Sequence, residues 1–552
     1  MLTATHDWVH LFEGETAGDV MRALPDILRT RRWFGGKARR IEAVRILDSI
    51  PIPCDSTTVL LLIRVEYEDG GMEIYTLPVT AAFGEASERI RREFPQAVIA
   101  SLAVQTNRTE QSGLLYDALW NRDLALALLH AIGQESRFIG MAGSIMASST
   151  NAFTDLVPAG SQLEPVVMRA EQSNTSVAYD GRVILKLYRR LGQGMNPDLE
   201  IGRVLTRMRF PYVPSIAGAL EYRDNSGNLV TLGVVQKFVV NDGDAWRSSL
   251  KAVGQFVDRI TQEHRLDERP PHKASRLLDL AREEYSPLAR HLIGPYLESA
   301  EQLGQRTAQL HLALSQVIDD PAFAPEALTS EYRQIQYESM VRGMAGALAL
   351  LKERVGLLST GGQANARVLF ALEPGLKRIF DAFGEIETPV LRIRCHGDYH
   401  LGQVLCTGAD FMIIDFEGEP ARSLAERRTK HPVLVDIAGM VRSFHYAPFA
   451  FLKGKGTWIE ADSPERPQES YPWAPFWSDW TSAAFLKGYL RTATGARFWP
   501  ENPEDVRLLL DVYLVEKAMY ELQYELNNRP DWVEIPLHGL VEILQTMGKN
   551  KS

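Results

Sequence analysis

Two aspartates and one amide side chain occur at spacings that are typical of phosphoryl transfer. Asp398 follows a glycine, Gln403 comes five residues later, and Asp415 ends the apolar run Phe411–Ile414. A carboxylate such as Asp398 can hold an acceptor hydroxyl in line with the γ-phosphate of ATP and accept its proton late in the reaction. Asp415 and the side-chain oxygen of Gln403 can serve as Mg²⁺ ligands. Either aspartate alone could be an ordinary turn or strand-end residue, but the combination predicts a kinase site with Asp398 as its catalytic residue.

A site of this kind also needs a lysine on a strand, near the α- and β-phosphates, and a helix glutamate paired with it. Lys186 lies inside the apolar run Val183–Tyr188, where a charge is unusual unless it is paired. A helix is predicted to begin at Asn196-Pro197, because asparagine favours the N-cap and proline the first helical position. Glu200 on this helix is the candidate partner, although the helix dipole alone also favours an acid in the first turn.

Small polar residues precede the strand that carries this lysine. The segment Glu171–Ser176 stands where protein kinases have a glycine-rich loop. We expect Ser173, Asn174 and Ser176 to contact phosphate oxygens through side chains and backbone N–H groups.

The order along the chain also predicts where the adenine lies. The strand expected at Thr231–Val240 should end in the hinge between two lobes. Gln236, Phe238 and Val239 are the candidate adenine contacts in this hinge.

One helix face offers a candidate site for a sugar acceptor. Lys517, Tyr520 and Tyr524 stand at positions i, i+3 and i+7, which share a face of a helix. A neutral sugar needs many hydrogen bonds from side chains with an apolar body and a polar tip. Alternatively, the tyrosines pack in the core and the lysine extends its ammonium to solvent.

Asp436, near a helix start, could accept hydrogen bonds from the catalytic-loop backbone or simply cap its helix.

Hydrophobic patterning predicts the elements that position these residues. The Asp180-Gly181 pair predicts a hairpin turn inside 175–188. The predicted strands are 41–50, 57–67, 72–79, 164–169, 175–188 and 231–240, with a short strand-rich island at 391–416. The predicted helices are 114–132, 299–315 and 505–527.

Composition is that of an ordinary globular protein. The chain has 552 residues, of which 45% are hydrophobic and 24% charged, and its net charge is −10. Such a charge disfavours nucleic acid as a partner. Three cysteines without a pairing pattern and without a CxxC motif disfavour a disulfide scaffold or a zinc site and favour a reducing compartment. The first residues lack the apolar core of a secretory signal, and Val59–Ile63 is the longest aliphatic stretch, so we expect a cytoplasmic protein without membrane contact.

Two further stretches each allow two interpretations. The basic segment Arg29–Arg40, with Gly35 and Gly36, could bind phosphate or could be a turn with a solvated or inter-domain basic face. The aromatic stretch within Phe451–Trp480 could be an acceptor-side lid or a packed surface excursion. Its aromatic residues include Tyr471, Trp473, Phe476, Trp477 and Trp480.

The catalytic segment resembles that of bacterial maltokinases, relatives of the aminoglycoside phosphotransferases within the protein-kinase-like fold. The matching segments are His396–Leu405 and Asp415–Pro420. The segment Arg32–Lys37 looks like the family's N-terminal cap signature, and Glu516–Leu537 looks like its C-terminal one. The similarity therefore spans nearly the whole chain, although the stretch Phe451–Trp480 looks longer than in the family.

This resemblance implies an α+β, bilobal protein-kinase-like fold. An N-terminal strand-rich cap with a connecting helix is expected at 1–134, an intermediate subdomain completing the nucleotide-side lobe at 135–240, and a mostly helical C-terminal lobe at 241–552. By resemblance, Asp398 is the catalytic residue, Gln403 and Asp415 are the magnesium ligands, and Lys186 is the ATP lysine.

The implied activity is the transfer of phosphate from ATP to the anomeric hydroxyl of maltose, giving maltose 1-phosphate in the route from trehalose to α-glucan. The resemblance also favours the sugar interpretation of Lys517, Tyr520 and Tyr524, and it adds His400 and Tyr446 as candidate acceptor contacts. Trehalose synthase is the possible protein partner. Two alternatives remain: a kinase of glucosamine or another amino sugar, and a non-catalytic kinase-fold partner of trehalose synthase.

Overall fold

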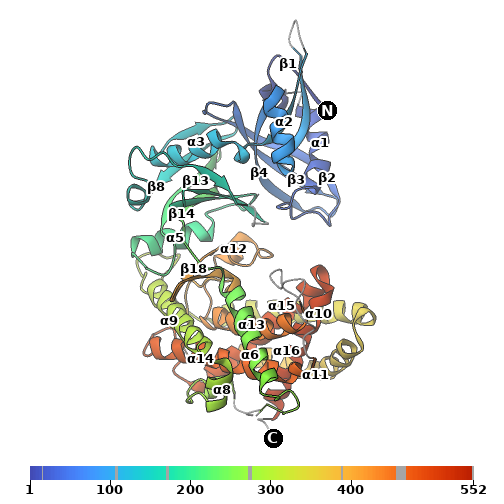
Figure 1. Ribbon diagram of the computed structural model, residues 1–552, viewed down its shortest axis with the longest axis vertical. Coiled ribbons are helices and arrows are strands. Elements are labelled where there is room, and N and C mark those ends of the chain that lie inside the picture. The colour runs from blue at the N-terminus through green and yellow to red at the C-terminus, as the bar shows by residue number, and fades with distance from the viewer. Residues whose placement is uncertain are drawn as a thin grey trace. The chain divides into compact units, whose positions relative to one another are not determined.

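The computed structural model divides the chain into two compact units, Met1–Val240 and Asn241–Ser552 (Figure 1). The structure describes residues 1–14, 17–105, 110–168, 173–270, 276–386, 389–454 and 468–549. The first unit is built mainly from strands and the second mainly from helices, so the chain belongs to the α+β class.

The first sheet of the N-terminal unit is mixed, with the strand order β1-β5-β6-β4-β3-β2. Its strands are β1 (Leu2–Thr5), β2 (Ile41–Ile52), β3 (Thr58–Tyr67), β4 (Met72–Phe83), β5 (Val98–Gln105) and β6 (Glu110–Asp117). Helices α1 (Ala17–Arg29) and α2 (Gly84–Glu93) accompany it. The long central strands are rich in Val, Ile and Leu because both of their faces are buried. The predictions for 41–50, 57–67 and 72–79 are confirmed.

The helix predicted for 114–132 is wrong in its first half. Leu114 and Leu115 belong to β6, which pairs with β4 and β5 in the interior of the sheet. Their side chains enter two different apolar clusters because successive residues of a strand face opposite sides. A short 3-10 turn follows at Ala118–Trp120, and the α-helix is α3 (Arg122–Gly133), capped by Asn121. Leucine spacing alone could not distinguish a doubly buried strand from the start of a helix.

The second sheet of this unit has the order β7-β8-β13-β14-β11-β10-β9. Its strands are β7 (Arg137–Ile139), β8 (Gly143–Ser149), β9 (Pro165–Val167), β10 (Asn174–Tyr179), β11 (Val183–Tyr188), β13 (Ile216–Asp224) and β14 (Leu229–Lys237). Helices α3, α4 (Phe153–Leu156) and α5 (Pro197–Arg207) lie with it. Asp180 and Gly181 have φ values of 47° and 65°, so the predicted hairpin turn is confirmed. Arg169 of the strand predicted at 164–169 lies outside the described residues.

A two-residue strand links the two sheets. β12 (Arg190–Leu191) follows directly after β11 in the chain but pairs with β4 of the first sheet. Beside it, the buried guanidinium of Arg189 donates to Asp117 at 2.5 Å, an ion pair between the two sheets. The strand that contains Lys186 is therefore continuous with one that belongs to the first sheet.

The basic segment Arg29–Arg40 forms turns beside the first sheet. Arg31 donates to the backbone carbonyls of Gln96 and Val98, and Arg39 forms an ion pair with Asp69. These two arginines therefore support the structural interpretation of the segment over phosphate binding.

The second unit packs its helices around α13, and Figure 1 shows α13 among α6, α14, α15 and α16. The helices are α6 (Ala245–Gln262), α7 (Leu277–Leu280), α8 (Pro287–Ile293), α9 (Tyr296–Ser315), α10 (Ser330–Arg354), α11 (Thr360–Gly384), α12 (Leu424–Arg427), α13 (Leu434–Leu452), α14 (Ala474–Thr492), α15 (Pro503–Asn528) and α16 (Glu534–Lys549). The helices predicted at 299–315 and 505–527 are confirmed as parts of α9 and α15. Two short two-stranded sheets complete the unit: β15 (Glu326–Ala327) pairs with β16 (Leu391–Arg392), and β17 (Val404–Thr407) pairs with β18 (Asp410–Ile413) in a hairpin.

The described aromatic residues of the stretch 451–480 belong largely to the helical core. Trp473 and Trp477 are fully buried, and Phe476 and Trp480 are nearly so. Trp477 stacks on Tyr296 of α9, and Phe476 stacks on Phe256 of α6. The packed interpretation therefore holds for these four residues, while 455–467 lie outside the described part of the chain. Among the described residues, no helix combines the length and apolarity needed to span a bilayer.

Candidate active site

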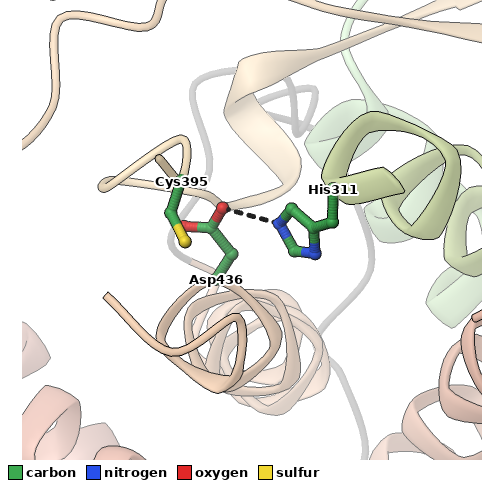
Figure 2. A group of neighbouring side chains, drawn as sticks. All are labelled: His311, Cys395 and Asp436. Carbon is green, nitrogen blue, oxygen red and sulfur yellow. Dashed lines mark hydrogen bonds and ion pairs between the residues drawn. The ribbon is translucent and has the colours of Figure 1, made fainter. Parts of the chain in front are cut away.

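A buried aspartate on a neighbouring helix holds the backbone of the loop that carries Asp398. Asp436, in the first turn of α13, accepts hydrogen bonds from the backbone N–H groups of His396 and Gly397 at 2.7 and 2.9 Å. Figure 2 shows the same carboxylate between Cys395 and His311, and His311 Nε2 lies 3.1 Å from it. Burial by itself would raise the pKa of Asp436, but these hydrogen bonds and the nearby histidines lower it overall, so the carboxylate stays ionised. The predicted contact between Asp436 and the loop is confirmed.

Two glycines allow the close packing of this loop. Gly397 has a φ of 84°, a backbone conformation that glycine adopts without strain. Gly439, on α13, lies directly behind the loop, and a Cβ atom there would stand 2.5 Å from the backbone oxygen of Tyr399. Tyr399 is buried and its hydroxyl lies 2.9 Å from that of Thr307. The loop therefore packs directly against α13 and α9.

The same loop is joined to the segment that carries Asp415. His396 Nε2 lies 2.9 Å from the carbonyl oxygen of Ile414, and the N–H of Ile414 donates to the carbonyl of Gln403 at 3.0 Å. The side-chain amide of Gln403 donates to Asp415 Oδ2 at 3.0 Å. Asp415 has a φ of 68°, which is uncommon for a residue other than glycine and is often seen at functional sites.

The residues of this junction fit a magnesium ion chemically. Because the Gln403 amide nitrogen donates to Asp415, the Gln403 side-chain oxygen is oriented as an acceptor beside a carboxylate. Carboxylate and amide oxygens are the ligands that Mg²⁺ prefers. Gln403 and Asp415 could therefore hold the ion together with nucleotide phosphates and water.

The carboxylate of Asp398 forms an ion pair with a lysine from the far end of the sequence. Lys517, on α15, lies 3.1 Å from Asp398 Oδ1 and 3.4 Å from Glu419 Oε1. The side chains of Asp398 and Lys517 retain 20% and 23% of their exposure, and that of Glu419 retains 6%. Burial alone would raise the pKa of Asp398, but the charges of Lys517 and His400 lower it overall. Asp398 is thus an ionised carboxylate that remains accessible.

A cavity of about 560 Å³ opens beside this ion pair, entirely within the second unit. Asp398, Glu419, Glu516 and Lys517 line it together with aromatic and small residues. Arg422 lies 2.7 Å from Glu419 and 3.5 Å from Glu516, so it balances part of the acidic charge. The volume falls in the range of about 300–1,000 Å³ that is common for small-molecule sites.

Two of the five candidate acceptor residues line this cavity. Lys517 and Tyr520 do so, with the lysine ammonium 4.9 Å from the centre of the Tyr520 ring. Tyr524 stacks on Tyr520 but is 41% exposed and lies outside the lining. His400 accepts from the N–H of Gly402 through Nδ1, and Tyr446 packs on Trp532; neither lines the cavity. The acceptor roles of all five residues stay predictions, and the position of Lys517 and Tyr520 in the cavity lining fits theirs.

Lys186 is a buried, paired lysine in the first unit. Its ammonium lies 3.4 Å from Asp198 Oδ2, which also accepts from the Tyr188 hydroxyl at 2.9 Å. Asp198 was not identified from the sequence, although it stands two residues before the expected partner on the same helix, α5. Glu200 is also buried on α5, and its pairing with Lys186 stays a prediction. Asn196 caps this helix as predicted.

The residues predicted to contact the phosphates lie in the first half of β10 or just before it. Ser176 of β10 is fully buried and pairs with Lys186 of β11 in the ladder. Asn174 begins β10 and Ser173 is exposed just before it, while Glu171 and Gln172 lie outside the described residues.

The residues predicted for the hinge lie at the end of β14. Gln236 is opposite Ile184 in the ladder, and the N–H of Phe238 donates to the carbonyl of Arg182. Phe238 and Val239 immediately precede the boundary between the two units at Val240. The adenine contacts proposed for this segment stay predictions.

Comparison with solved structures defines the class of fold. Over 91% of this chain and 94% of the other, the structure is similar to a glucosamine kinase in complex with glucosamine, ADP and inorganic phosphate, with a TM-score of 0.57 and 17% identity. A second crystal form of glucosamine kinase gives a TM-score of 0.59 over 93% and 96% of the chains, again at 17% identity. The chain therefore has a bilobal, protein-kinase-like fold.

Within this class the chain is maltokinase-like. Residues 28–120 match the family of maltokinase N-terminal cap domains. The chain is also 26% identical, over 252 residues, to a glucosamine kinase of Streptacidiphilus jiangxiensis, covering 44% of this chain and 49% of that protein. A glucosamine kinase of Mycolicibacterium smegmatis is 30% identical over 94 residues, 17% of this chain and 23% of that protein. The matched segments thus span about half of the length of the first relative and about a quarter of that of the second.

Proposed function

We propose that this protein is an ATP-dependent sugar kinase. The observation that carries this proposal is the ionised carboxylate of Asp398, which lies in a cavity of about 560 Å³ and in the same loop system as Gln403 and Asp415. The kinase-like fold and the maltokinase-like cap support it.

In the proposed reaction, Asp398 accepts a hydrogen bond from an acceptor hydroxyl and orients its oxygen. A bond forms between that oxygen and the γ-phosphorus of ATP, the bond from the γ-phosphorus to the β–γ bridging oxygen breaks, and the proton passes to Asp398. Mg²⁺ held by Gln403 and Asp415 would supply charge neutralisation for the phosphates. Lys517 keeps Asp398 ionised and oriented before the sugar binds.

The nucleotide is proposed to bind through the first unit. Lys186, oriented by its ion pair with Asp198, is the group for the α- and β-phosphates. Glu200 is proposed to support the same lysine. The phosphate contacts are assigned to Ser173, Asn174 and Ser176, and the adenine contacts to Gln236, Phe238 and Val239.

Maltose is the first candidate acceptor, phosphorylated at its anomeric hydroxyl. The cavity has room for a disaccharide, and Tyr520 offers it an aromatic face with a polar tip. Lys517 and Arg422 form ion pairs with carboxylates of the cavity, which leaves fewer acidic groups to receive an acceptor that carries an ammonium group.

Glucosamine is the second candidate. The two curated relatives reported above are glucosamine kinases. The cavity also contains the acidic side chains Glu419 and Glu516, which could pair with an amino group if Arg422 moved away.

An acceptor panel separates these candidates. The purified protein is incubated with ATP and Mg²⁺ and with maltose, glucosamine, glucose or N-acetylglucosamine, and the product is analysed for the position of its phosphate. Saturable formation of maltose 1-phosphate supports the first candidate, whereas turnover of glucosamine alone would replace it with the second.

The Asp398→Asn variant tests whether the protein is an enzyme of this kind. Turnover should fall by about 10²–10⁴-fold because the proton acceptor is lost, while ATP affinity changes little. Unchanged turnover would reject the role of Asp398. If no sugar on the panel is phosphorylated, the remaining proposal is a non-catalytic partner of trehalose synthase, for which co-purification of the two proteins would be the test.

A further inference from the structure

Three potential metal ligands meet between α13 and α16, at positions that the proposed reaction does not use. His445 lies on α13, and His538 and Glu542 lie on α16. One ligand atom from each residue lies within 4.8 Å of the other two. His538 and Glu542 stand four residues apart, so both side chains project from one face of their helix.

The distances within this group are close to those between ligands of one ion. Glu542 Oε2 lies 3.4 Å from His445 Nε2 and 3.7 Å from His538 Nδ1. Two ligands bound to one tetrahedral zinc ion at about 2.0–2.1 Å stand roughly 3.3–3.5 Å apart. Within the described residues, both ring nitrogens of His445 and Nδ1 of His538 are buried without a hydrogen-bond partner.

An ordinary histidine–glutamate pair in the same unit has a different geometry. His291 Nε2 lies 2.6 Å from Glu263 Oε1, a hydrogen-bond distance. Such a pair can therefore close to hydrogen-bond distance in this unit, although the exposed pair His10–Glu13 of the first unit is 3.5 Å apart.

A glycine permits the close approach of the two helices at this point. A Cβ atom on Gly539 would lie 2.4 Å from Nη1 of Arg442 and 3.0 Å from Cε1 of His445. The absence of a side chain therefore lets the first turns of α16 reach the imidazole on α13. Figure 1 shows these two helices in the second unit, and they pack against each other.

The electrostatic surroundings also suit a cation. Arg442, on the same helix as His445, is a nearby positive charge. Arg442 itself is neutralised by Glu521 at 2.7 Å. Asp479 lines the same cavity as His445 and Glu542 and could add a further oxygen. The side chain of His538 is 41% exposed, so the group lies close to the protein surface.

The other histidine cluster of this unit lacks these properties. In the group shown in Figure 2, His311 uses both ring nitrogens in contacts with Asp436 and Tyr489. Burial raises the pKa of Cys395 well above its usual value, so the thiol is protonated. This cluster is a hydrogen-bonded support for the catalytic loop.

We propose that His445, His538 and Glu542 bind a divalent transition-metal ion, with zinc as the best match, and that the ion fastens α16 to α13. Two imidazoles and one carboxylate suit Zn²⁺ and Co²⁺ far better than Mg²⁺, which prefers oxygen ligands. The site is separate from the proposed magnesium site and does not depend on the sugar kinase activity.

The test uses the full chain after dialysis against a chelator, without nucleotide or sugar. Co²⁺ is titrated and its visible absorption is recorded, and Zn²⁺ is then added to displace it. One equivalent of Co²⁺ should bind with the absorption of a low-symmetry nitrogen–oxygen site, and Zn²⁺ should displace it and raise the unfolding temperature.

Variants locate the ion. His538→Gln and Glu542→Gln should each weaken binding by at least about 10-fold, while His291→Gln, which removes the ordinary histidine of the other pair, should leave it unchanged. Unfolding of the metal-free variants is followed to establish that they fold. Absence of Co²⁺ binding to the wild type, or equal affinity in the His538 and Glu542 variants, would overturn the proposal.

Discussion

Replacing Lys517 with methionine removes the positive charge beside Asp398 while keeping most of the side-chain volume. The lysine nitrogen and the Asp398 oxygen are 3.1 Å apart. Unit charges about 4 Å apart at an effective dielectric constant of about 20 interact by about 4 kcal/mol, which corresponds to a pKa change of about 3. Because both side chains keep about a fifth of their exposure, we expect the pKa of Asp398 to rise by about 1–3.

The sign of the effect follows from the role of the carboxylate. Asp398 must be ionised to accept the proton, and its pKa is held low in the wild type. In Lys517→Met the acidic limb of the plot of kcat/KM against pH should therefore move upward by about 1–3 pH units. Activity should be lost at mildly acidic pH and largely recovered near pH 8.

The assay is initial-rate kinetics with saturating ATP and Mg²⁺ from pH 5 to pH 9, using the acceptor identified by the panel. Lys377→Met is the matched control, because that exposed lysine forms an ion pair with Asp381 far from any proposed role. An acidic limb that stays in place in Lys517→Met, with normal activity, would refute the reasoning. A decrease of kcat/KM by the same factor at every pH would instead indicate that Lys517 contacts the phosphate being transferred.

Three further substitutions test the support of the site. Asp436→Asn should lower the free energy of unfolding in urea by about 1.5–3 kcal/mol, because it removes a charged hydrogen-bond acceptor from the loop backbone. Gly439→Ala should destabilise by about 1–3 kcal/mol and lower kcat, because the new methyl group collides with the backbone oxygen of Tyr399. His431 is buried with a pKa lowered to about 3, so the unfolded chain binds an extra proton between about pH 3 and 6.5 and stability falls as the pH falls through this range. His431→Gln should reduce the loss between pH 6.5 and 4.5 by about 2–3 kcal/mol, measured by urea unfolding at both values.

Each of these substitutions has its own contrary outcome. The surface substitution Asp381→Asn should leave the free energy of unfolding nearly unchanged. If it lowers this free energy as much as Asp436→Asn does, the proposed role of Asp436 is contradicted. Gly375→Ala, in a helix with open space around it, should stabilise by about 0.4–1 kcal/mol, and equal behaviour of Gly439→Ala would contradict the proposed collision. For His431→Gln, a stability curve parallel to that of the wild type would show that another group causes the acid sensitivity.

The catalytic segment could be predicted because its chemistry is local in sequence. Asp398, Gln403 and Asp415 lie within one short stretch, and hydrogen bonds along that stretch connect the loop to Asp415. The contact of Asp436 could also be anticipated, because an acid at a helix start must satisfy nearby backbone donors.

Contacts between distant parts of the chain could not be predicted in the same way. Lys517 was selected for its place on a helix face, but nothing in that spacing indicates Asp398, 119 residues away, as its partner. Asp198 was missed because an acid in the first turn of α5 is already explained by the helix dipole. The leucines of β6 fitted a helical spacing only because both faces of that strand are apolar.

The short strand β12 bears on how this protein could be dissected. β12 pairs with β4, and the guanidinium of Arg189 forms an ion pair with Asp117 in the other sheet. A chain that begins after the first sheet would leave β12 without this partner and a buried cation without this counter-charge, which favours aggregation and costs stability. Expression of residues 121–552 alone is therefore expected to give a poorly folded protein, even though these residues include Lys186 and Asp398.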